Sequence, residues 1–194
     1  MLISGTDLTN IPILGLQTGS ELATIESEVI NPHNLSVIAF TLTGPLLDNP
    51  LSLLRIEDIR EFSQIGMIVD SSDEFVQPDE VIKLKPIYDL QFSLGNKHVL
   101  NEKRAKLGKV MDYIVDSDSF VIQQLIVRRP LLKSFNDSEL LVHRSQVIEV
   151  TDDAIVVKEL ASSKALPLTK NSKSYINPFR QQSPQTDSSH ATQD

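Results

Sequence analysis

The sequence contains no cysteine, and only 7 of its 194 residues are glycine. The absence of cysteine excludes a disulfide scaffold, a thiolate metal site and a cysteine nucleophile. No Gly-x-Gly-x-x-Gly or Gly-x-x-x-x-Gly-Lys segment occurs, so no glycine loop is available to cradle a nucleotide phosphate. Apolar runs stay below the ~18 residues of a membrane-spanning helix, and the first ten residues lack the pattern of a signal peptide. We therefore expect a cytoplasmic protein without a membrane span.

The net charge of −8 is spread unevenly along the chain. Residues 1–91 hold 4 Lys/Arg and 14 Asp/Glu, residues 92–160 hold 10 of each, and residues 161–194 hold 4 and 2. The acidic first region would repel a phosphate backbone, so direct binding of nucleic acid is not expected. It suits a solvated acidic face, which is the favoured interpretation, or a basic protein partner.

Short runs of β-branched and apolar residues, bounded by turn residues, predict strands along most of the chain. The clearest runs are residues 36–43, 66–70, 110–115, 120–127, 139–142 and 154–158. Only one or two helical turns are expected, over residues 56–63 and 78–84. The last residues are rich in Gln, Ser and Thr, with a short apolar island at 175–179, and this composition predicts a disordered tail over residues 161–194.

The chain also matches itself, first at an offset of 85 residues and further along at 88. The change in offset falls in the loops 44–50 and 129–138, where differences in length are tolerated. The apolar register predicts a tandem duplication of an all-β unit. Among the corresponding pairs are Leu35 and Phe120, Val37 and Ile122, Phe40 and Leu125, Phe62 and Val150, and Met67 and Ile155.

Residues 95–112 (GNKHVLNEKRAKLGKVMD) resemble the opening hairpin of the PRC-barrel domain. That pattern is a glycine, a β-residue, a turn and then Leu-Gly-x-Val-x-Asp, and it is met by Val99, Leu107, Gly108, Val110 and Asp112. Residues 113–127 resemble the next hairpin of that domain. The family often has glycine at the first turn, where this repeat has Arg104; the first repeat has Gly19 there, but Ala23 in place of Gly108.

The resemblance implies an all-β chain of two tandem small antiparallel PRC-type β-barrels with short helical turns. We expect residues 1–91 to form the first repeat with a connecting segment, residues 92–160 the second repeat, and residues 161–194 the disordered tail. Two small barrels gain by packing on each other, so we predict a fixed pair. The apolar residues of segment 82–94 are expected to pack along or between them: Ile87, Tyr88, Leu90, Phe92 and Leu94.

No residue pattern predicts a catalytic residue, a metal or a cofactor. The four histidines, His33, His98, His143 and His190, form no close pair. The acidic segments 70–74 and 116–118 lack the twelve-residue spacing of a calcium loop, and no Gly-x-Ser-x-Gly nucleophile elbow occurs. We assign Asp112 a structural role, in which its carboxylate accepts hydrogen bonds from turn amides.

One local concentration of basic residues falls in the second repeat. It supplies the candidate partner-binding residues Lys103, Arg104, Lys106, Lys109, Arg128 and Arg129, with Lys97 and Lys133 nearby. A rim of cations could meet an acidic protein, RNA, or the acidic first repeat of another copy, which leaves oligomerisation open. Aromatic residues for base stacking are missing there. A solvated, solubilising hairpin is the favoured alternative.

The resemblance implies a non-enzymatic protein-interaction or assembly module with an unidentified protein partner. PRC-barrels form the carboxy-terminal domain of RimM-type ribosome-maturation factors, which contacts a ribosomal protein, and the cytoplasmic domain of the photosynthetic reaction-centre H subunit. The acidic first repeat would suit a basic ribosomal protein, so ribosome maturation or assembly is one alternative function. A small-ligand-binding or catalytic protein that uses the cleft between the barrels is the other.

Overall fold

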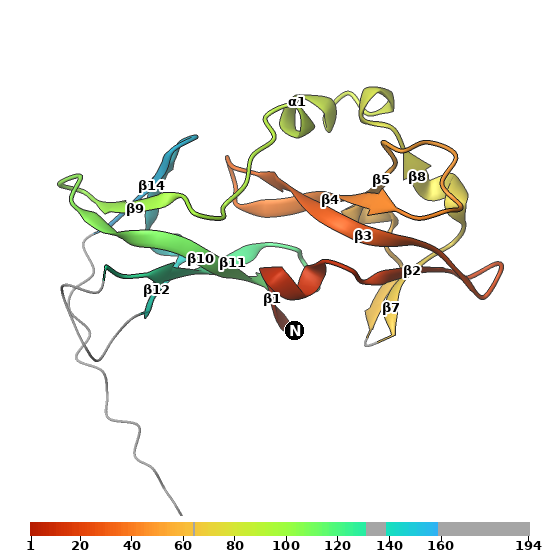
Figure 1. Cartoon of the computed structure of the whole chain (residues 1–194), viewed down its shortest axis with the longest axis horizontal. Helices are drawn as coiled ribbons and strands as arrows, with labels where there is room; N and C mark the ends of the chain where they lie inside the picture. Colours follow the sequence, from red (N-terminus) through yellow and green to blue (C-terminus); the bar gives the residue numbers. More distant parts are fainter. Residues whose placement is uncertain (64, 131–138, 159–194) are drawn as a thin grey trace, which may run out of the picture. The chain divides into compact units, whose positions relative to one another are not determined.

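A computed structural model of the chain describes residues 1–63, 65–130 and 139–158, which are rich in β-strands (Figure 1). The β-rich class expected from the sequence is therefore confirmed. The predicted tail at 161–194, with its apolar island at 175–179, lies outside the described residues, as do Lys133 and His190. No helix in the described part of the chain is long and apolar enough to cross a bilayer.

The first sheet contains seven strands in the order β6-β7-β2-β3-β4-β5-β8. All neighbours in it are antiparallel except β2 and β7, which pair in parallel. Strand β4 (SVIAFTLT) is dominated by β-branched and apolar residues, which favour a buried strand. The bounds are β2 Pro12–Gly15, β3 Ser20–Asn31, β4 Ser36–Thr43, β5 Leu53–Arg55, β6 Glu61–Ser63, β7 Gly66–Val69 and β8 Phe75–Val76.

The second sheet runs in the order β12-β11-β10-β9-β14-β13, and β1 from the start of the chain also pairs with β10. Its one parallel pair is β9 with β14. The bounds are β1 Leu2–Ser4, β9 His98–Asn101, β10 Lys106–Asp116, β11 Ile122–Arg128, β12 Glu139–His143, β13 Val147–Val150 and β14 Ala154–Val157.

The two sheets have corresponding strand orders. Strands β2 to β5 of the first sheet correspond to β9 to β12 of the second, and β6 and β7 correspond to β13 and β14. Each sheet has its parallel pair at the same place. Strand β8 has no counterpart among the described residues of the second sheet, and β1 has none in the first.

The long hairpin of each sheet carries its irregularities at corresponding positions. In β3 the pairing shifts between Ile25 and Ser27 and again between Val29 and Ile30. In β10 it shifts between Val110 and Asp112 and between Ile114 and Val115, which are the same positions at the offset of 85. A β-bulge bends a strand and increases its twist, so both hairpins are bent alike.

The two hairpins meet at their tips through a reciprocal pair of hydrogen bonds. The Val37 N–H donates to the Phe120 carbonyl, and the Ile122 N–H donates to the Leu35 carbonyl, each at 2.9 Å. Leu35 and Phe120 have φ values of 50° and 53°, an uncommon conformation outside glycine. Because the bonded residues correspond between the repeats, the contact has approximate two-fold symmetry.

One apolar core runs through both sheets. Leu8, Phe40 and Met67 from the first part of the chain belong to the same cluster as Ile122 and Ile155 from the second. Phe120 adds an edge-to-face contact with Phe40 and a stacked contact with Phe62, at centroid distances of 5.8 and 6.3 Å. Burial on this scale is the main stabilising term in folding.

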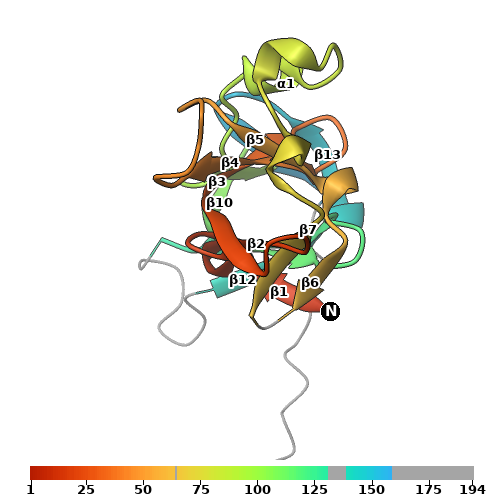
Figure 2. The same ribbon diagram turned by 90° about the vertical axis from the view of Figure 1, so that its right-hand side faces the viewer.

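The closed barrels expected from the sequence are not found among the described residues, because neither strand order returns to its starting strand. Figure 2 shows that strands β2 to β7 nevertheless curl round. In the second sheet the edge strands β12 and β13 are joined directly by the 3-10 helix η5 (Arg144–Gln146). These two strands form no ladder with each other, and η5 connects them instead. The Gln146 carbonyl in η5 accepts a hydrogen bond from the Lys158 N–H at 2.8 Å.

The remaining helical elements are single turns. They are the 3-10 helices η1 Gly5–Leu8, η2 Ile56–Asp58, η3 Ser72–Glu74 and η4 Pro78–Glu80, and the short helix α1 Lys85–Tyr88. In the expected packing segment 82–94, Leu94 is fully buried, and Ile87 and Tyr88 pack in a small second cluster with Val29. Leu90 is exposed, so the expectation for that residue is wrong.

Candidate interaction surfaces

The predicted cationic residues fall in two places on the second sheet. Lys109 is the cross-strand partner of His98 on β9 and of Arg128 on β11, and Arg128 is in turn opposite Glu139 on β12. Cross-strand partners point to the same face, with Cβ atoms ~5 Å apart. The structure therefore brings His98, Lys109 and Arg128 together as a row, which we call the cationic row.

Lys109 and Arg128 are both exposed, although like charges directly opposite each other are unfavourable. The Arg128 guanidinium lies 2.9 Å from the Met111 sulfur. Among the described residues, Glu139 is the one acidic residue in register with this row. The cationic row thus has a surplus of positive charge on the solvent face of the sheet.

Of the other predicted cations, Lys103, Arg104 and Lys106 lie at the turn between β9 and β10, Lys97 directly before β9 and Arg129 directly after β11. Arg104 has a φ of 60° and forms an ion pair with Glu149 at 3.0 Å. Lys103 and Lys106 are exposed beside it, whereas Arg129 is half-buried beyond the end of β11. Lys97 lies over the Phe92 ring at 4.4 Å and donates to the Asp152 carbonyl. Arg104 and Lys97 therefore already interact with groups of the same chain.

A cavity of about 770 Å³ opens beside η2, η4 and α1 in the first repeat. Ile82 on its wall is 89% exposed. We call this cavity the acidic groove, because it lies in the acidic first repeat. Its apolar lining is Val37, Ile38, Ile56, Val81, Ile82, Leu84 and Ile87, and its polar lining is Asn31, Arg55, Glu57, Glu80 and Lys83.

Two cations at or near the acidic groove, Arg55 and Lys85, pair with acids of the same repeat. Arg55 pairs with Glu57 at 2.5 Å and Asp58 at 2.6 Å. Lys85 pairs with Asp79 at 2.7 Å and with Asp89 at 3.5 Å. The sequence indicated the acidic excess, but not the groove, because its lining comes from three separate segments that only the fold brings together.

A second cavity, of about 550 Å³, lies between β1 of the second sheet and β6 of the first. We call it the junction groove. Its apolar lining comes from Leu2, Ile3, Ile11, Pro12 and Phe62. The other residues that line it are Met1, Asp7, Asn10, Ser63, Gly66, Ser117 and Asp118.

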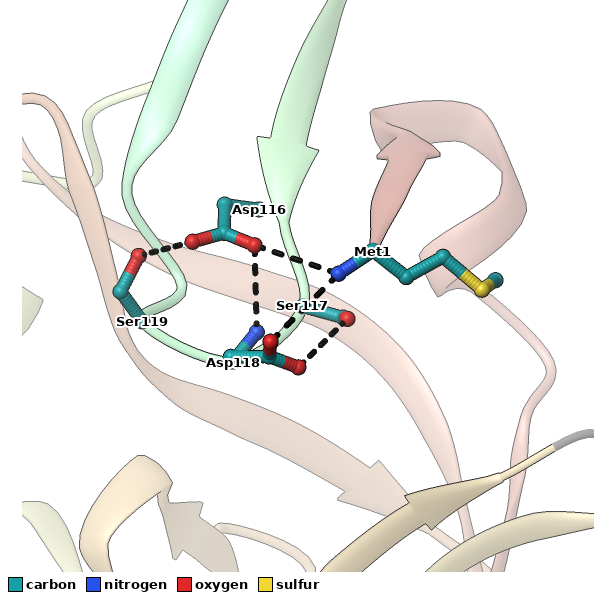
Figure 3. Close-up of polar contacts among 5 residues, drawn as sticks. All are labelled: Met1, Asp116, Ser117, Asp118 and Ser119. Carbon is teal, nitrogen blue, oxygen red and sulfur yellow. Dashed lines mark hydrogen bonds and ion pairs between the residues drawn. The ribbon is translucent and has the colours of Figure 1, made fainter.

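The turn after β10 holds the amino group of Met1 at one end of the junction groove (Figure 3). The Met1 amine lies 3.4 Å from an Asp116 oxygen and 3.6 Å from an Asp118 oxygen. The Ser119 hydroxyl donates to the other Asp116 oxygen at 2.7 Å. The hydrogen bond from Ser119, followed by those from the Asp118 N–H and the Met1 amine, holds the pKa of Asp116 below its usual value.

Asp112 and Tyr113 lie between η1 and β10. The Asp112 carboxylate accepts hydrogen bonds from the Thr6 N–H at 3.2 Å, from the Thr6 hydroxyl at 3.1 Å and from the Ser4 hydroxyl. The Tyr113 ring covers Gly5, where a Cβ atom would overlap the ring. Its hydroxyl is buried without a hydrogen bond of good geometry, and burial, followed by the charge of Glu28, raises its pKa.

Within residues 1–63, 65–130 and 139–158, no three His, Asp or Glu side chains converge as a metal site. His143 instead caps η5, where its Nδ1 accepts from the Ser145 N–H at 3.2 Å. Asp70 pairs with Arg60, which holds the pKa of Asp70 below its usual value.

Neither a protein-family model nor a curated protein matches the sequence. The acidic groove, the junction groove and the cationic row are therefore the features on which a function can be based.

Proposed function

We propose that this chain is a non-enzymatic protein-interaction or assembly module built from two PRC-barrel-type repeats. The corresponding strand orders and bulges of the two sheets support the duplicated unit. The acidic groove is the observation that carries the proposed function, because it leaves several apolar side chains in contact with solvent.

Exposed apolar surface with a polar rim is typical of a site that another protein covers. The lining itself carries two acids, Glu57 and Glu80, and two cations, Arg55 and Lys83. The repeat around it is strongly acidic, with 4 Lys/Arg against 14 Asp/Glu in residues 1–91. A basic segment with an apolar face fits these properties, since complementary charge speeds encounter and sets orientation.

The test is a comparison of two full-length variants, each at an exposed apolar position. Ile82→Asp places a charge on the wall of the acidic groove, whereas Leu46→Asp changes a residue that is 67% exposed and does not line it. We expect Ile82→Asp to release a protein that the wild-type chain and Leu46→Asp both retain in quantitative affinity purification. Identical sets of bound proteins for all three chains would contradict the proposal.

A ribosomal protein is the alternative partner that the acidic first repeat favours. Sedimentation with ribosomal subunits at low and moderate salt tests it, because binding between opposite charges weakens as salt screens them. Association at low salt that Ile82→Asp removes would support this partner. Absence of the chain from every particle fraction counts against it.

The cationic residues provide a separate test of a partner with acidic groups. Charge reversal of Lys103, Arg104 and Lys106 is expected to weaken binding to an acidic protein if the turn contacts it. Charge reversal of Lys109 and Arg128 tests the cationic row in the same way. The alternative, a solvated hairpin, predicts no change in either case.

A further inference from the structure

We propose that the junction groove binds an extended peptide segment by strand addition, with a basic side chain of the peptide near Asp7 and Asp118. This inference rests on the proposed function, because it assigns a second binding mode to the same interaction module. It concerns a different surface from the acidic groove, so the two can fail separately.

Two strand edges without ladder partners among the described residues lie along this groove. Strand β1 pairs with β10 alone, and β6 pairs with β7 alone. The outer edge of such a strand presents unpaired N–H and C=O groups, which an added strand can bond. Strand β1 (LIS) is only three residues long, and it contains no charged residue or proline that would hinder an added strand.

The walls of the groove suit the side chains of an extended peptide. Ile3, Ile11 and Phe62 are half-buried in its lining, and Leu2 is 61% exposed. Side chains of a strand alternate between its two faces. A peptide with an apolar residue at every second position would therefore place one row of side chains on this lining.

Charge at the same place favours a basic residue in the peptide. Asp116 and Asp118 share the one amine of Met1. Asp7 also lines the groove and forms no ion pair with a described residue. Three carboxylates against one amine leave net negative charge, which attracts Lys or Arg.

The duplicated architecture does not by itself account for this groove. At the offset of 85, the residues that correspond to β1 are 87–89, and the helix α1 (Lys85–Tyr88) occupies that part of the chain. A helix presents no strand edge, because its backbone groups bond within the helix. The β1 edge therefore has no counterpart elsewhere in the described part of the pseudo-symmetric body.

The test follows amide chemical shifts of the labelled full-length chain as a capped synthetic peptide is added. The probe alternates valine and threonine and carries one lysine. We expect shifts in Leu2–Ser4 and Glu61–Ser63 at peptide concentrations up to about 1 mM, which is the range of a weak complex. Replacing the lysine with glutamate is expected to weaken binding.

Two further comparisons separate strand addition from simple apolar contact. Two N-methylated peptides are compared with the parent, one methylated at the odd-numbered amides and the other at the even-numbered amides. Each methylation pattern blocks the N–H groups along one edge of the extended peptide. At least one of the two should bind about tenfold more weakly than the parent. The variant Leu2→Asp should also bind more weakly, whereas Leu16→Asp, 66% exposed and outside the groove, should not.

Absence of shifts at the two edges, or equal affinity of both N-methylated peptides and the parent, would overturn the inference. The proposed function is judged separately by Ile82→Asp. Loss of a partner in Ile82→Asp without peptide binding leaves the acidic groove as the interaction site and removes the strand-addition site alone. Peptide binding without any effect of Ile82→Asp supports the strand-addition site and removes the acidic groove as an interaction site.

Discussion

Gly108 lies where β10 packs closely against its neighbour β11. A Cβ atom there would overlap the Arg128 carbonyl oxygen and lie 2.8 Å from Val127 Cγ1. We expect Gly108→Ala to lower the free energy of unfolding by about 2–3 kcal/mol, because the backbone must shift to relieve the overlap. Urea unfolding measures the change.

Gly95→Ala is the matched control for that substitution. A Cβ atom at Gly95 would meet only the Ser93 hydroxyl, at an ordinary distance of 3.6 Å. Losses of similar size in the two variants would show that glycine flexibility, rather than close packing, sets the cost at Gly108.

Tyr113 gives a prediction for high pH. Its buried hydroxyl has a raised pKa, so above pH ~10 the unfolded chain loses a proton that the folded chain keeps. Stability should therefore fall as the pH rises above that value, and Tyr113→Phe should remove part of this fall. At neutral pH the substitution should be neutral or slightly stabilising, because it deletes a polar group without a partner.

Thermal unfolding at about pH 8 and pH 10.5 brackets the relevant titration. Tyr88→Phe serves as the control and should keep the alkaline loss of stability. An identical decline for Tyr113→Phe and the wild-type chain would contradict the assigned cause.

Among the elements, η1 depends on a carboxylate that lies far along the chain. Asp112 on β10 accepts two hydrogen bonds from Thr6. We expect Asp112→Ala to cost about 1–3 kcal/mol, because three donors near η1 lose their acceptor. Hydrogen exchange should accelerate over residues 2–8 first. Asp48→Ala, at an exposed loop position, should leave that exchange unchanged.

The elements also show how far sequence reasoning reaches. Residues 36–43 were predicted as a strand and form β4, because a run of β-branched residues is a strong local signal. The predicted strand 120–127 begins instead at Ile122, since Phe120 has the positive φ of the tip contact. No local sequence pattern predicts a positive φ at a phenylalanine.

The sequence does not predict whether the sheets close into barrels or where grooves form. Whether β12 and β13 form a ladder depends on the geometry of η5, which a hydrophobic pattern does not specify. The junction groove combines residues near 2, 62 and 117, and no spacing in the sequence relates them. The cationic residues were recognisable by composition, but their division between a turn and a row required the strand register.

At the scale of the whole molecule, the shared core predicts a single unfolding transition. Phe120 is 4% exposed and contacts two aromatic rings of the other repeat. We expect Phe120→Ala to cost about 3–5 kcal/mol and to destabilise both repeats together. Hydrogen exchange of β3 and β10 should rise in parallel. Ile148→Ala, at an exposed position, is the control.

The tip contact has a consequence for how the halves recognise each other. Phe120 is received by Phe40 and Phe62, but the corresponding positions in its own repeat are the aliphatic Leu125 and Val150. If two copies of the second repeat were related by the same two-fold axis, each Phe120 would pack against Leu125 and Val150 of the other copy, and neither is aromatic. The tip contact is therefore chemically asymmetric, and Phe120 gains ring contacts from the first repeat that a second copy of its own repeat would not supply.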